Sequence, residues 1–167
     1  MQDTFPQFKS LLIKFTYRKV PFWARLFQEL GLFLKVGKIV KISEYKTNVF
    51  VNTGKTSLLK RMAGLNYGEI TYLALGDNTA TPAASDTKLG NELFRKAVTQ
   101  KSAGGLTFYS KTFISSTEGN YTYKEAGLFG DDATGAVDSG TLFTRIAIDE
   151  TKASGQSATV EYNIVAT

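Results

Sequence analysis

Four consecutive residues, Gly54-Lys55-Thr56-Ser57, have the types that end a phosphate-binding loop, in which backbone N–H groups, a lysine and a hydroxyl hold a nucleotide. The full motif needs another glycine five residues before Gly54, and that position holds Val49. Val49 also falls in a predicted strand, where there is no loop to surround phosphates. We therefore interpret the segment as the start of a helix, and we expect no nucleotide or other cofactor.

Three aspartates, Asp131, Asp132 and Asp138, lie in the glycine-rich stretch 130–140. Clustered carboxylates in a loop supply the hard oxygen ligands that calcium prefers. The acids are adjacent and then six positions apart, which does not fit a calcium-loop pattern. A solvated turn is the favoured interpretation, and no metal site is expected.

The chain contains neither cysteine nor histidine. The absence of cysteine excludes disulfides and thiolate metal sites. The absence of histidine removes the commonest general base and metal ligand. We therefore expect no catalytic site, no enzyme activity and no small-molecule substrate.

Charge divides the chain after Tyr67. Residues 1–67 carry 12 Lys/Arg and 3 Asp/Glu, a net +9, whereas residues 68–167 carry 8 and 12, a net −4, which together give the overall +5. The basic part predicts an arm whose partners are acidic protein surfaces, nucleic acid or anionic lipid. Its first lysines alternate with aromatic residues over 8–17, a pattern typical of single-strand nucleic-acid contact and equally of a β-strand.

An amphipathic helix is predicted over residues 20–35, because apolar residues recur there at spacings of three and four. Its stripe contains Phe22, Trp23, Leu26, Phe27, Leu30 and Phe33. The stripe packs on the protein's own core, enters a neighbouring subunit or lies on a membrane surface. Polar and charged residues interrupt the apolar stretch 22–40, so no membrane span is expected, and the start of the chain does not resemble an export signal. We expect the chain to be soluble or assembled with other proteins.

The remaining elements are mostly strands. They are expected at 38–43, 45–51, 69–75, 92–99, 106–115 and 158–164, with a helix at 55–63 closed by Gly64. The final strand has the clearest alternation of apolar and polar residues. The fold class is therefore mainly β: an antiparallel β-sandwich or jelly-roll-like domain at 68–167, preceded by an N-terminal helical arm at 1–67.

The C-terminal segments carry a family resemblance. They comprise a strand ending in Leu-Gly-Asp (75–77), a Thr/Pro/Ala loop, Glu-Ala-Gly-Leu-Phe (125–129) and Gly-Thr-Leu-Phe (140–143). In this combination the chain resembles small β-sandwich proteins of tailed-bacteriophage particles. The resemblance implies a corner where a strand leaves the sheet, built from Glu125, Gly127, Leu128 and Phe129. Gly127 would allow close backbone approach or positive φ, and Glu125 would accept N–H groups of the following turn or pair with Arg145.

The resemblance also implies a function. The chain is expected to be a non-enzymatic structural component of the virion, assembled in the host cytoplasm and placed at the tail, baseplate or fibre attachment. Head decoration or a collar or neck position is the alternative, and a non-specific nucleic-acid-binding module ranks below it. The expected partners are other virion proteins and further copies of the chain, with weak contact to nucleic acid.

Overall fold

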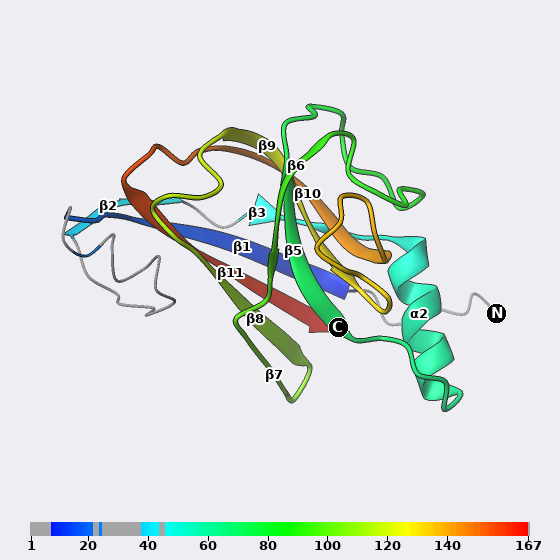
Figure 1. Ribbon diagram of the computed structural model, residues 1–167. Helices are drawn as coiled ribbons and strands as arrows, with labels where there is room; N and C mark the ends of the chain where they lie inside the picture. The colour runs from blue at the N-terminus through cyan, green and yellow to red at the C-terminus, as the bar shows by residue number, and fades with distance from the viewer. Residues whose placement is uncertain (1–7, 22–23, 25–37, 44–45, 167) are drawn as a thin grey trace.

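Two antiparallel sheets and one short helix make up the computed structural model, which describes residues 8–21, 24, 38–43 and 46–166 (Figure 1). We call the sheets A and B. Sheet A has the order β2-β1-β11-β8-β7, and β3 also pairs with β1. Its strands are β1 (Phe8–Lys19), β2 (Lys38–Ile42), β3 (Lys46–Thr47), β7 (Gln100–Gly104), β8 (Thr107–Ile114) and β11 (Gln156–Ala166).

Sheet B has the order β4-β10-β9-β5-β6. Its strands are β4 (Val49–Phe50), β5 (Ile70–Gly76), β6 (Glu92–Ala97), β9 (Thr122–Gly130) and β10 (Thr141–Thr151). The helix α2 (Asn52–Met62) lies at one end of this sheet, beside the loop between β9 and β10 (Figure 1). The mainly β class is confirmed, and the arrangement is that of a β-sandwich.

One main core joins the facing sides of the two sheets. Alternation explains it: in β11 the buried residues Ala158, Val160, Tyr162 and Ile164 take every second position, so their side chains share one face. Strands β1, β5 and β10 contribute to the same core. A second, smaller cluster on the outer face of sheet B is formed by Val51, Ala74, Leu89, Phe129 and Leu142. The outer face of sheet B is therefore covered in part by the 77–91 and 131–140 loops, from which Leu89 and Ala133 contact this cluster, whereas Leu58 of α2 packs against the main core.

Residues assigned to the N-terminal arm supply strands to both sheets. Strand β1 pairs with β2 on one side and β11 on the other, and β4 pairs with β10. The alternating segment 8–17 is thus a strand, one of its two predicted interpretations. Of the helix expected over 20–35, almost all lies outside the described residues, including its whole aromatic stripe.

The strands expected at 38–43, 69–75, 92–99, 106–115 and 158–164 agree in position with β2, β5, β6, β8 and β11. The strand expected at 45–51 is divided into β3 in sheet A and β4 in sheet B, and β9 and β10 were not among the strands predicted from the sequence pattern. Helix α2 begins at Asn52, three residues before the expected start. Residues 100–104 form strand β7, although no strand was expected between those at 92–99 and 106–115. All five β7 residues are exposed, so neither an apolar run nor an apolar face marked the segment as a strand.

Candidate functional site

The segment expected to form a corner lies inside strand β9. From Glu125 to Phe129 its residues pair with β10 and β5, so the strand does not leave the sheet at this point. Gly127 has no positive φ, contrary to one of the two expectations for it. Close approach is its role, because a Cβ at this position would lie 2.8 Å from the carbonyl oxygen of Thr144 and 3.1 Å from Cδ2 of Leu89. Leu128 faces the main core and Phe129 the outer cluster.

Glu125 is the centre of a buried ion pair. Its carboxylate accepts a hydrogen bond of 2.8 Å from Nε of Arg145, the partner expected across the sheet. Its other donors are the backbone N–H groups of Gly90 at 3.0 Å and Asn91 at 2.9 Å, and not those of the turn after β9. The carboxylate occupies the space above Gly76, where a Cβ would lie 2.6 Å from Oε1. Glu125 thus holds the end of the 77–91 loop on sheet B.

Arg145 extends this network into the middle of the same loop. Its Nη1 donates to Asp86 at 2.7 Å and its Nη2 to the carbonyl oxygen of Ala80 at 3.3 Å. Burial disfavours the ionised form of Asp86, but the hydrogen bonds from Ala83 and Arg145 outweigh it and lower the pKa of Asp86. The guanidinium therefore bridges the strand carboxylate and the loop carboxylate.

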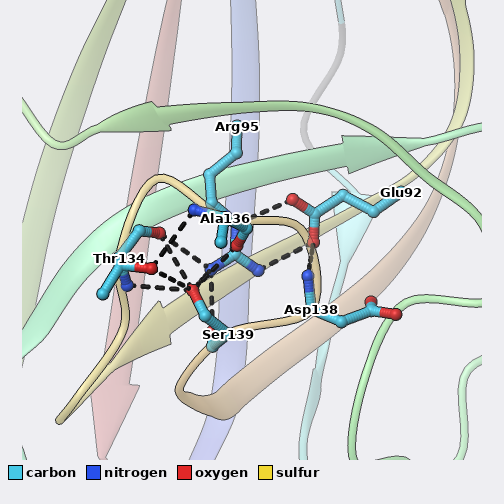
Figure 2. Close-up of polar contacts among 6 residues, drawn as sticks. All are labelled: Glu92, Arg95, Thr134, Ala136, Asp138 and Ser139. Atoms are coloured by element: carbon cyan, nitrogen blue, oxygen red, sulfur yellow. Dashed lines mark hydrogen bonds and ion pairs between the residues drawn. The ribbon is translucent and has the colours of Figure 1, made fainter.

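A second buried pair, Glu92 with Arg95 in β6, holds the 131–140 loop. Nε and Nη2 of Arg95 each donate to Glu92 at 2.7 Å, in a two-point contact whose side chains are 2% and 0% exposed. Figure 2 shows the remaining guanidinium nitrogen directed at the loop, where Nη1 donates to Ser139 O at 2.7 Å and to its Oγ at 2.9 Å. The guanidinium also lies 4.3 Å from the ring centroid of Phe129.

The 131–140 loop is internally bonded around Ser139 (Figure 2). Its Oγ accepts the Thr134 N–H at 2.9 Å and donates to the carbonyl oxygen of Ala136 at 2.8 Å. The Asp138 N–H is directed at Glu92, 3.3 Å away. Asp131 and Asp138 both have φ of 59°, a conformation that aspartate tolerates better than most residues. The loop is therefore held in one shape by short polar contacts.

The three loop aspartates do not converge on a cation. Asp131 accepts hydrogen bonds from Ser57 Oγ at 2.8 Å and the Gly68 N–H at 2.7 Å, whereas Asp138 pairs with Lys88 at 3.3 Å. Asp132 is exposed. Among the described residues, no three side chains of ligand type are placed to hold a metal ion.

Gly54 and Lys55, which suggested a phosphate loop, lie within helix α2. The Lys55 N–H donates to Val51 O at 3.1 Å as part of the helix, and Val51 itself bonds to Phe143 in β10. A Cβ at Gly54 would lie 2.6 Å from Cα of Phe143, so the glycine allows the helix to contact the sheet. The segment has a packing role here, and the loop that would surround a phosphate is replaced by strand β4.

Sequence reasoning identified Glu125, Gly127 and Arg145, and missed Asp86, Glu92, Arg95 and Ser139. The Glu92–Arg95 pair had one signal in the sequence. Two opposite charges flank the apolar residues 93–94 inside a predicted strand. Their contact with the 131–140 loop had no local signal. The expected interface residues Phe22, Trp23, Leu26, Phe27, Leu30 and Phe33 lie outside the described residues.

The described site is built to hold two loops on a sheet. Each of the buried glutamates, Glu92, Glu125 and Glu150, forms an ion pair with an arginine or lysine.

Among the described residues, no helix has the length and apolar character needed to cross a membrane. The chain matches no protein-family model, no curated protein and no solved structure.

Proposed function

We propose that this chain is a non-enzymatic structural component of a tailed-bacteriophage particle, at the tail, baseplate or fibre attachment. Head decoration or a collar or neck position is the alternative within the same class. The proposal combines the resemblance of residues 70–165 with one structural observation: the buried pairs Glu125–Arg145 and Glu92–Arg95 fasten both long loops to sheet B. A domain whose loops are held in one conformation suits a structural subunit, because it presents the same surface to each neighbour and loses little conformational entropy on binding.

The use of the carboxylates supports a structural role over a catalytic one. A catalytic acid or base needs access to substrate and a pKa matched to proton transfer. Glu92 and Glu125 instead have almost no exposed surface, and their oxygens accept bonds from arginine and backbone N–H groups. Their geometry serves to hold loops in place.

Assembly is the proposed mechanism. The chain acts with other virion proteins and as a homo-oligomer, with the virion as its location after assembly in the host cytoplasm. Its N-terminal aromatic stripe, including Phe22, Trp23 and Phe27, is proposed to bind a neighbouring subunit, because aromatic side chains dominate protein interfaces. The large positive charge of residues 1–67 favours an acidic neighbour.

Purified particles provide the test. We expect a gene deletion to remove one defined density from a map of the particle, and re-expression of the chain to restore it. A matched pair of complementing variants sharpens the result: Glu125→Ala, which disrupts a buried pair, and Leu106→Ser at a side chain that is 68% exposed. Leu106→Ser should restore the density and Glu125→Ala should restore less of it. Particles that keep every density after the deletion would exclude the virion role.

A nucleic-acid-binding role is the second candidate, supported by one contact in sheet A. Lys19 of β1 lies opposite Lys38 of β2, and both are exposed. Like charges in facing positions repel, and a phosphate between them would relieve the repulsion. Binding to random DNA that weakens steeply with salt, and that Lys19→Glu with Lys38→Glu removes, would favour this role over a purely structural one.

A further inference from the structure

Helix α2 and the turn after it expose an apolar group with a cationic border. The exposed fractions are 44% for Leu59, 83% for Met62 and 49% for Leu65. Lys60 and Arg61 lie between Leu59 and Met62 in sequence. The first acidic residue after the helix, Glu69, pairs with Lys101. We call Leu59, Lys60, Arg61, Met62 and Leu65 the helix surface. Three large apolar side chains exposed together are typical of a contact surface.

The cations of the helix surface have local roles that leave their charge exposed. Lys60 Nζ lies 4.4 Å from the ring centroid of Tyr67, and Arg61 reaches Asn66 at 3.4 Å. Both sit in the last turn, where positive charge stabilises the helix end. These roles account for two cations and do not explain the exposure of Met62.

The 131–140 loop exposes the complementary combination. Val137 is 60% exposed and is followed by Asp138, and Asp132 is exposed as well. The loop contains no lysine or arginine, although Lys88 from the 77–91 loop pairs with Asp138 at 3.3 Å. We call Asp132, Val137 and Asp138 the loop surface. Because Ser139 and Arg95 already fix the loop, little conformational entropy would be lost on binding.

The two surfaces lie at the same end of the molecule. Ser57 of α2 bonds to Asp131, the first residue of the loop, at 2.8 Å, and the Gly68 N–H bonds to the same carboxylate at 2.7 Å. Figure 1 shows α2 and the β9–β10 loop together there. A two-fold axis that passes between the two surfaces would place the helix surface of each copy on the loop surface of the other.

We propose that a second copy of this chain binds here, with the helix surface of one copy against the loop surface of the next. Val137 would pack among Leu59, Met62 and Leu65, with Lys60 and Arg61 facing the aspartates. A contact between two helix surfaces is disfavoured, because it would bring cations together. Anionic lipid and nucleic acid are disfavoured by the aspartates beside the helix. The inference deepens the homo-oligomer part of the proposed function and rests on that part alone.

Charge reversal in solution tests the contact. The first variant is Lys60→Glu with Arg61→Glu, and the second is Asp132→Lys with Asp138→Asn, since asparagine tolerates the positive φ of Asp138. Sedimentation and light scattering of the full chain, up to about 1 mM, give the oligomeric state. We expect each variant alone to weaken self-association about tenfold or more, and an equimolar mixture of the two to recover it.

Apolar truncation provides a matched comparison. Met62→Ser and Val137→Ser should each weaken association, whereas Leu106→Ser, at the β7–β8 turn and 68% exposed, should not. Circular dichroism confirms that each variant is folded. A wild-type chain that stays monomeric over the whole range would overturn the proposal, as would reversed variants that associate like wild type or fail to recover on mixing. Binding of phosphatidylserine vesicles that depends on Met62 would also contradict it. None of these results depends on particles, so failure here is distinguishable from failure of the virion role.

Discussion

Replacing Glu125 by glutamine should destabilise the protein strongly while barely changing its shape. The side chains of Glu125 and Arg145 are 1% and 5% exposed, so neither charge can be solvated when the pair is broken. Glu125 accepts hydrogen bonds from Nε of Arg145 and from the N–H groups of Gly90 and Asn91, and Nη2 of Arg145 also lies 2.8 Å from its Oε2. A glutamine has one carbonyl oxygen, and its NH₂ group would face a donor.

The size of the effect follows from burial. Breaking a buried ion pair by removing one charge costs about 3–5 kcal/mol, because the other charge stays buried. Because Asp86 still pairs with Arg145 at 2.7 Å in the variant, we expect Glu125→Gln to lower the free energy of unfolding by the smaller of these values, about 3 kcal/mol. Asp149→Asn is the matched control: Asp149 forms a pair of similar length with Lys124, 2.6 Å, but its side chain is 69% exposed. Its removal should cost below about 1 kcal/mol.

Urea unfolding of the two variants measures the difference directly. Amide hydrogen exchange adds a local readout, because loss of the Glu125 contacts should release the N–H groups of Gly90 and Asn91 before the strands open. Equal free energies of unfolding for Glu125→Gln and Asp149→Asn would refute the reasoning. Unchanged exchange at residues 90–91 would show that the carboxylate does not hold the loop.

Four further outcomes are expected. Gly127→Val should lower the free energy of unfolding, measured by urea titration, by about 3 kcal/mol, because the added side chain overpacks against Thr144 and Leu89. Gly135→Ala is the control and should be neutral, because no atom lies within 4 Å of the added Cβ. Deleting residues 1–37 should leave a chain without native circular dichroism, because it removes β1 from within sheet A; a folded product would mean that β11 does not need this partner. Calorimetry with ATP and magnesium should detect no binding, and binding lost in Lys55→Ala would contradict the packing role of that segment. Burial lowers the pKa of Lys152 to about 8, so above that pH the unfolded chain binds more protons than the folded one. The free energy of unfolding should therefore rise by up to about 1.4 kcal/mol per pH unit between pH 8 and 9.5. Lys152→Met should flatten this slope, and an unchanged slope would exclude Lys152 as its source.

Local patterns predicted most strands and the helix, because burial on one face leaves a period that can be read in the sequence. The alternation in β11 and the apolar run of β5 are examples. Strand β7 escaped prediction because pairing with β8, and not burial, forms it. For Gly127 the sequence left two alternatives, a positive φ in a bend or a close backbone approach, and the neighbour across the sheet, Thr144, shows that close approach is the actual constraint.

The candidate site was predictable only where partners face each other across adjacent strands. Glu125 and Arg145 lie two positions out of register in the β9–β10 pairing, so the sheet alone brings them together. Asp86 and Ser139 reach the site through loops. The position of the Glu125 carboxylate in turn depends on Gly76 of β5, which has no side chain to fill the space that the carboxylate occupies. Information of this kind is distributed over the fold and has no short motif.

The pairing of β1 with β11 has a consequence for how the chain acquires its fold. The first strand described is bonded along its length to the last, from Phe8 opposite Ala166 to Lys19 opposite Gln156. During synthesis, β1 is made before the other described strands, and its main partner β11 is made after them. Such high contact order slows folding, and it leaves the backbone N–H and C=O groups along one edge of β1, and its apolar face, uncovered in the meantime. Chaperone dependence and low-temperature expression are therefore expected to matter more for this chain than for a helical protein of equal length.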